Sequence, residues 1–252
     1  MRILKYDGSF AGFLCTIQHS LDMNLAECTF SISSEDDTNL FDEKIVIDTD
    51  INTSKKIWNL IKSKVDNLIL RQFYVVFLSE DKLAIMACFK TILKVLQCGK
   101  NILNNFSDED IIVFHQMIRK VEREKHRMMA FVRFKKSTDG VYFSTIEPDY
   151  NVLPLIAKFF KYRYADQPWL IYDIKRKYGL SYDLTQVVEI QLLATSAENS
   201  ILPAIQLVND EDLYNKLWRD YYNSTNIESR RNLKLHIKNV PKRYWKYLIE
   251  KG

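Results

Sequence analysis

Apolar side chains in the first half of the chain recur every three to four residues, the spacing of one face of an amphipathic helix. An acidic, polar stretch at 31–43 interrupts this pattern and predicts an exposed loop, and Lys44 to Asp48 predicts a short strand. Thr53 or Ser54 is the expected cap of the helix that follows this strand. The amino-terminal half is therefore predicted to be mostly helical. Helices are expected at about 10–21, 53–66, 67–98 (in two segments) and 107–125.

The pattern changes at His126. From Arg127 to Phe134 apolar and polar residues alternate, and an Asp139–Gly140 turn leads into 141–146, which together predict a β-hairpin. Such a hairpin, followed by a helix and further strands, is typical of an α+β fold with a mainly antiparallel sheet and packed helices in the carboxy-terminal half. We divide the chain into an amino-terminal region, 1–70, and a core domain, 71–252, with helices at 71–125 and the sheet with its helices at 126–252. Further elements are expected as a helix at 153–164, strands at 169–173, 178–182 and 187–192, and helices at 210–222, 228–237 and from Pro241.

Several function classes are disfavoured by what the sequence lacks. It has no run of about 18 apolar residues for a membrane span and no signal peptide at its start, so a cytoplasmic protein is expected. The 6 glycines form no phosphate-binding loop. The 4 cysteines, at 15, 28, 88 and 98, lack zinc-site spacing and are expected to be free thiols, those at 88 and 98 in the core. We expect no metal, no disulfide and no cofactor.

Charge is distributed unevenly along the chain. Residues 1–126 hold 16 Lys and Arg against 18 Asp and Glu, a balance of −2, whereas residues 127–252 hold 20 against 14, a balance of +6. An acidic partner would therefore meet the carboxy-terminal half first.

One candidate for chemistry is the charged run from Glu122 to Arg127. On a helix, Glu122 and His126 share a face, so the carboxylate could orient the imidazole, and Arg127 could bind a phosphate through two hydrogen bonds. The alternative is a solvated helix end, which the spacing alone favours.

A second candidate is the segment from Glu147 to Pro154. Glu147 and Asp149 flank Pro148 at a stiff junction between a strand and a helix, where a site could be held rigidly. The alternative, which we favour from the sequence, is that Asp149 or Asn151 only caps the next helix.

Basic residues alternate with aromatic rings in two further places, a pattern that can neutralise phosphates and stack on bases. The first combines Arg163 and Trp169, the latter expected at a loop edge, with the basic turn Lys175, Arg176 and Lys177. The second is the tail, where a solvated helix face with buried rings is an equal alternative. Its candidate nucleic-acid ligands are Arg230, Lys234, Lys238, Lys242, Arg243 and Trp245.

Over nearly its whole length the chain resembles a bacterial family of unknown function assigned to DNA metabolism and repair. The resemblance rests on segments that begin at Tyr6 (YDGSFxGFL), His126 (HRMMAFVRF), Glu147 (EPDxxVLPL), Arg163 (RYxDQPWLIYD), Trp218 (WxxYY) and Pro241 (PKRYW). From about residue 71 it is also similar to a domain fused to uracil-DNA glycosylases. Arg127 and Arg133 lie in the central segment and join the nucleic-acid candidates.

The resemblance implies a DNA-related task beside a separate radical S-adenosylmethionine protein. Our leading hypothesis is a DNA-binding accessory protein of repair or modification that acts with such a partner. The alternative is a metal-independent hydrolase, of nuclease or glycosylase type, that uses His126 with Asp149 or Glu147, with Glu122 as a further candidate. A pocket that joins His126 to a carboxylate would favour the hydrolase.

Overall fold

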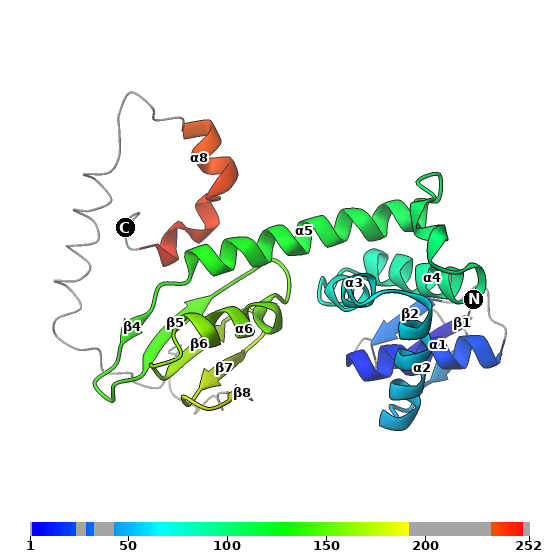
Figure 1. The fold of residues 1–252 in the computed structure, drawn as a ribbon, viewed down its shortest axis with the longest axis horizontal. Coiled ribbons are helices and arrows are strands. Elements are labelled where there is room, and N and C mark those ends of the chain that lie inside the picture. Colours follow the sequence, from blue (N-terminus) through cyan, green and yellow to red (C-terminus); the bar gives the residue numbers. More distant parts are fainter. Residues whose placement is uncertain (1, 24–28, 33–42, 192–232, 249–252) are drawn as a thin grey trace. The chain divides into compact units, whose positions relative to one another are not determined.

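The computed structural model of the protein describes residues 2–23, 29–32, 43–191 and 233–248. By its internal contacts the chain divides into two compact units, Met1–Glu122 and Arg123–Gly252 (Figure 1). The first unit is mostly helical and the second carries a mainly antiparallel sheet with helices, which confirms the predicted α+β fold. Among the described residues, no helix is long and apolar enough to cross a membrane.

The first unit contains a small parallel sheet that the sequence pattern did not predict. Strand β1 (Arg2–Tyr6) pairs on one side with β2 (Thr29–Ile32) and on the other with β3 (Glu43–Val46). Only β3 was anticipated, as the strand expected at 44–48. The predicted loop at 31–43 is wrong at both ends, because Ser31 and Ile32 belong to β2 and Glu43 to β3. Its residues 33–42 lie outside the described part.

The first four helices of this unit begin at side-chain caps. Ser9 caps the first helix, and aspartates at 50, 66 and 81 accept a backbone N–H in the first turns of the next three. Thr53 and Ser54 were the expected caps of the second helix. That prediction is wrong, because Asp50 is the cap and Thr53 donates to it. The helices are α1 (Phe10–Asp22), α2 (Ile51–Lys64), α3 (Asn67–Phe77), α4 (Lys82–Cys98) and the short 3-10 helix η1 (Lys100–Asn104).

Aromatic rings hold these elements together. Phe30 of β2 lies edge-on to Phe89 of α4, with ring centroids 4.6 Å apart, and Phe10 and Phe13 of α1 contact Phe77 of α3. The cysteines at 15 and 88 are buried free thiols, whereas Cys98, expected in the core, is exposed because it is the last residue of α4. Cys28 lies outside the described residues.

Helix α5 (Glu109–Phe131) is longer than expected and replaces the first predicted strand. The strand prediction for Arg127 to Phe134 is therefore wrong. Arg, Met and Ala in this stretch are good helix formers, and the buried Met128 continues the helical face. The alternation over these few residues does not reflect a strand, and strand pairing begins only at β4 (Lys135–Lys136).

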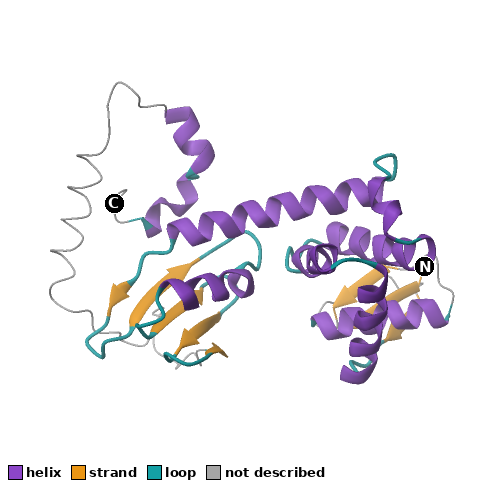
Figure 2. Cartoon of the chain, viewed as in Figure 1, coloured by secondary structure: helices purple, strands orange, loops and turns teal. Residues whose placement is uncertain are grey.

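The second unit is built on one five-stranded sheet of order β4-β5-β6-β7-β8. Its strand pairs are antiparallel except β5 with β6, which are parallel because the crossover helix α6 (Leu153–Arg163) joins them. Helix α6 lies across one face of the sheet (Figure 2), where Phe160 packs against Trp169. The remaining strands are β5 (Tyr142–Ile146), β6 (Trp169–Asp173), β7 (Tyr178–Tyr182) and β8 (Val187–Ile190).

The described chain ends with helix α8 (Leu233–Asn239) and the 3-10 helix η3 (Lys242–Tyr247). We call residues 233–248 the basic C-terminal segment. The helix predicted at 210–222 and the start of the one at 228–237 lie outside the described residues. The proposed division at residue 70 stays a prediction.

Gly179 on β7 offers a test of the packing of this sheet. A Cβ atom there would lie 2.9 Å from the backbone oxygen of Ile171 and 3.0 Å from the Tyr172 ring. We expect Gly179→Val to lower the free energy of unfolding of the second unit by about 1–3 kcal/mol, the usual cost of overpacking. Ser181→Val, at a half-exposed position on the same strand, should change it by no more than about 0.5 kcal/mol. Equal denaturation midpoints for the two variants would contradict the tight packing at Gly179.

Candidate functional site

A buried carboxylate on α5 is the centre of a polar cluster in the second unit. Glu124 is 1% exposed and accepts hydrogen bonds from the backbone N–H of Asp149 at 2.9 Å and from the hydroxyl of Tyr244. Arg127 lies 3.4 Å and Arg243 3.7 Å from its second oxygen. A buried carboxylate is costly unless such partners surround it, so Glu124 requires all four groups in place.

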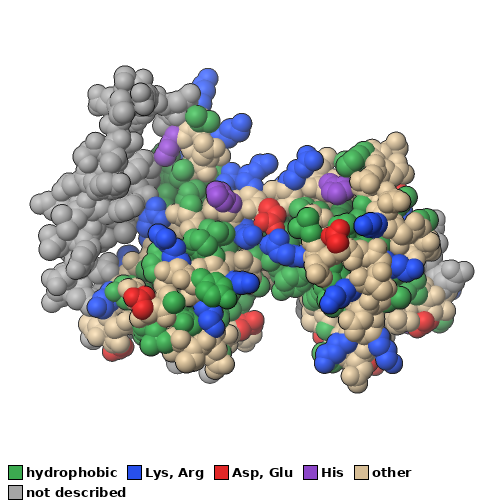
Figure 3. Space-filling model, viewed as in Figure 1, with side chains coloured by type: hydrophobic (Ala, Val, Ile, Leu, Met, Phe, Trp, Pro, Cys, Tyr) green, Lys and Arg blue, Asp and Glu red, His purple; other side chains and the backbone are tan. Residues whose placement is uncertain are grey.

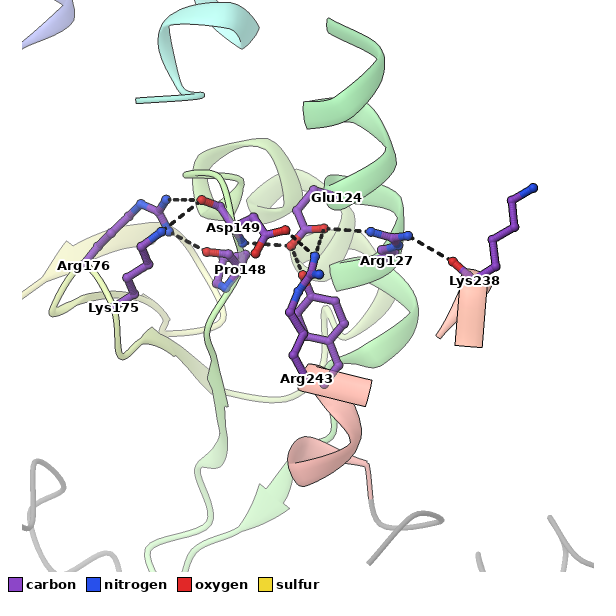
Figure 4. Close-up of polar contacts among 9 residues, drawn as sticks. Glu124, Arg127, Pro148, Asp149, Lys175, Arg176, Lys238 and Arg243 are labelled. Atoms are coloured by element: carbon purple, nitrogen blue, oxygen red, sulfur yellow. Dashed lines mark hydrogen bonds and ion pairs between the residues drawn. The ribbon is translucent and has the colours of Figure 1, made fainter. Parts of the chain in front are cut away.

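The loop after β5 contacts both this carboxylate and the C-terminal segment (Figure 4). The side chain of Asp149 forms an ion pair with Arg243, while its backbone N–H points to Glu124. The expectation that Asp149 or Asn151 caps helix α6 is wrong. The residue at the cap position is Val152, which has no side-chain cap bond, and Asn151 instead accepts a hydrogen bond from Tyr178 at 2.5 Å.

The turn after β6 supports the same loop from the other side. Arg176 pairs with the fully buried Asp173 at 2.9 Å and donates to the backbone oxygens of Pro148 and Asp149, each at 3.1 Å. Lys175 donates to the oxygen of Asp149 at 3.2 Å. Burial raises the pKa of Asp173, against the opposing effect of Arg176. The Arg176 side chain is only 8% exposed, and its hydrogen bonds stabilise the loop after β5. This position does not support the prediction that Arg176 binds phosphate.

Helix η3 brings two tyrosines and two cations to this cluster. Lys246 and Tyr247 bond the carboxylate of Glu147 at 2.5 and 2.7 Å, and these hydrogen bonds lower the pKa of Glu147. Burial and the neighbouring Glu124 raise the pKa of Tyr244, so its hydroxyl stays a donor to that carboxylate at neutral pH. The guanidinium of Arg243 also lies over the Tyr244 ring, 4.6 Å from its centre.

Several predicted site residues thus meet, although the sequence had assigned them to separate patterns. Arg127 bridges Glu124 to the backbone oxygen of Lys238, whose side chain points away from the cluster (Figure 4). The members that sequence reasoning had named are Arg127, Glu147, Asp149, Lys175, Arg176, Lys238 and Arg243.

The proposed acid–base pair on α5 is not brought together. Glu122 forms an ion pair with Arg71 at 2.9 Å within the first unit. His126 is exposed, and no hydrogen bond or ion pair joins it to Glu122, Glu147 or Asp149 in the described part of the chain.

The other predicted nucleic-acid ligands lie outside this cluster. Trp245 donates to the oxygen of Val240 at 3.0 Å, and Arg133 to that of Ala130 at 2.6 Å. Arg230 lies outside the described residues. The remaining candidates have exposed side chains, and they are Arg163, Lys177, Lys234 and Lys242.

Trp169 is not at a loop edge as predicted. It is the first residue of β6, 1% exposed, and it packs against Phe134, Phe160 and Tyr182. Its polar neighbours in sequence misled the prediction, because the alternation of β6 turns its ring into the core beneath α6. A base cannot stack on a ring buried in this way.

Sequence reasoning missed the residues that organise the cluster, above all Glu124, Asp173 and Tyr244. Glu124 lies in the same charged run as Glu122 and His126, and its helical spacing of three residues from the buried Val121 was the signal that it faces inward. Tyr244 lies within the closing PKRYW segment, where the neighbouring cations are the more obvious candidates to bind an anion.

A comparison with protein families places the second unit and part of the first in one match. A family model described as a domain of unknown function, DUF4130, matches residues 83–250, more than half of the chain. The chain belongs to the DUF4130 family. All the residues of the polar cluster lie within the DUF4130 match, whereas the opening segment at 6–14 lies outside it. A comparison with curated proteins found no match.

Metal binding is not suggested by the described side chains. Within residues 2–23, 29–32, 43–191 and 233–248, no three His, Cys, Asp or Glu side chains are grouped so that they could hold a metal ion. The DUF4130 cluster pairs its carboxylates with cations and hydroxyls instead.

Because Trp169 is buried, its substitution should lower the stability of the second unit. We expect Trp169→Ala to destabilise the second unit by about 3–5 kcal/mol, because it empties a large site in the aromatic core. Tyr162→Ala, which removes a ring of α6 that is 70% exposed, should cost about 0.5 kcal/mol or less. Thermal denaturation of both variants tests this, and equal stability would contradict the burial of Trp169.

The contact of Glu147 with η3 predicts a dependence on pH. The pKa of Glu147 is lowered below its ordinary value of 4.5, so the contact stabilises the segment above that pH and is lost as the pH falls through the lowered pKa. Amide hydrogen exchange of residues 242–248 should therefore be protected near neutral pH and should lose protection in acid. The variant Glu147→Gln should lack this dependence, and a wild-type profile in that variant would contradict it.

Proposed function

We propose that this DUF4130 protein binds nucleic acid, with DNA as the expected ligand, through its basic C-terminal segment. The observation that carries the proposal is the charge of residues 233–248, which include five cations and no Asp or Glu. Of these cations, Lys234, Lys238 and Lys242 are exposed. On the face shown in Figure 3, lysine side chains project from α8 near the top of the view.

The surrounding carboxylates do not cancel this charge at the exposed lysines. Glu124 is buried, and Glu147 and Asp149 are paired with Lys246 and Arg243. Phosphates bind to such a surface by displacing counterions, which gives affinity without base recognition. Lys177 in the turn after β6 is a further exposed cation of this unit.

The cellular role rests on the resemblance described above. We propose an accessory protein of DNA repair or modification in the cytoplasm that acts beside a radical S-adenosylmethionine protein. The hydrolase alternative gains no support from the geometry, because His126 bonds neither Glu147 nor Asp149 in the described structure.

The test is titration of labelled DNA, single-stranded and duplex, with the full chain at several salt concentrations. We expect the triple variant Lys234→Ala, Lys238→Ala and Lys242→Ala to bind every sequence more weakly. Three lost phosphate contacts should flatten the plot of log affinity against log salt by roughly 2 to 3 units.

A matched control removes the same charge from the first unit. Lys55, Lys62 and Lys64 are exposed on α2, and their substitution by Ala should leave the salt dependence unchanged. Wild-type protein that binds neither DNA form, or equal effects of the two triple variants, would overturn the proposal.

A further inference from the structure

The basic C-terminal segment is held by contacts that converge on one carboxylate. Glu124 accepts a hydrogen bond from the hydroxyl of Tyr244 in η3. Arg127 pairs with Glu124 at 3.4 Å and also donates to the backbone oxygen of Lys238 near the end of α8. Arg243 lies 3.7 Å from the same carboxylate. Both helical parts of the segment are thus connected to Glu124, directly or through one side chain.

Glu124 itself offers no surface to a ligand. It is 1% exposed, whereas Lys234, Lys238 and Lys242 extend into solvent from the segment that it holds. Glu124 can therefore affect an anionic ligand in two ways only, through the position of the segment or through its charge at a distance.

We infer that Glu124 is a positioning residue that holds the basic C-terminal segment in place for binding. Tight binding of a nucleic-acid backbone to this segment then requires the negative charge of Glu124. The inference rests on the proposed function. A segment already docked on Glu124 presents its lysines at fixed spacing, whereas a released segment must lose conformational freedom when it binds, and affinity falls accordingly.

The sign of this effect separates positioning from simple charge. Neutralising a carboxylate in a protein that binds phosphates normally strengthens binding, because it removes repulsion. Asp139 is an exposed carboxylate in the turn between β4 and β5, so Asp139→Asn changes the net charge by the same amount as Glu124→Gln. Positioning predicts opposite results for these two variants.

The experiment uses the full chain with a labelled oligonucleotide, single-stranded and duplex, at one fixed salt concentration. We expect Asp139→Asn to bind as the wild type does or more tightly. Glu124→Gln should bind roughly tenfold more weakly, a loss of about 1.4 kcal/mol. In protein without DNA, amides of residues 242–248 should exchange faster in Glu124→Gln and at the wild-type rate in Asp139→Asn.

A second variant covers the case in which Glu124→Gln does not fold. Tyr244→Phe removes only the hydroxyl that Glu124 accepts and keeps the ring, which packs against Phe131. It should reproduce the faster exchange and the weaker binding. The double variant should fall short of the sum of the two single effects, because both remove the same contact.

The outcomes distinguish the two proposals. If the wild type binds but Glu124→Gln and Tyr244→Phe keep its affinity, positioning by Glu124 is wrong and the proposed function stands. Positioning is equally wrong if the variants release the segment without loss of affinity. If the wild type binds no DNA, the proposed function fails, and this inference fails with it.

Discussion

The second unit depends on the pairing of one carboxylate that water cannot reach. A buried charge must be matched by donors at defined directions, and Glu124 draws its donors from three separate parts of the chain: its own helix, the loop after β5 and helix η3. Apolar contacts could hold these parts together but would leave them free to slide. Hydrogen bonds to a single buried group fix the relative positions of these parts. The loss of any one member of such a network is destabilising.

Cations of this unit play two different roles. The arginines at 127, 176 and 243 each bond several acceptors, and two of them reach backbone oxygens on another element. A planar guanidinium with five donors suits that work. The lysines at 177, 234, 238 and 242 are exposed. A count of basic residues therefore overstates the charge open to a phosphate backbone, and Lys175 and Lys246, which bond Asp149 and Glu147, add to the engaged group.

Local signals predicted most of the fold. The strands β5, β6 and β7 were expected because turn residues and a proline bound short apolar runs, and helix α6 because its apolar spacing is regular. Such features depend on a few neighbouring residues. By contrast, the end of α5 was missed because the stretch from Arg127 satisfies both a period of two and a helical face, and tertiary packing decides between them.

The candidate site was harder to predict because burial of a charge depends on distant residues. Glu124 looks like its exposed neighbours in sequence, and its partner Tyr244 follows 120 positions later. The reverse error occurred at Trp169, whose polar neighbours suggested exposure although the ring lies under α6. The strand β1 was missed for a third reason, since its parallel partners are not adjacent to it in sequence.

The boundary of the family match bears on whether the matched segment can fold by itself. It begins at residue 83, directly after the first residue of α4. The inner side of that helix carries Phe89, which meets Phe30 of β2, and Cys88, whose thiol contacts the backbone oxygen of Phe73 on α3. A fragment cut at residue 83 would expose this face to water without its natural covering. In this chain the folded unit therefore extends beyond the family match, because residues before 83 supply part of the apolar surface that covers α4.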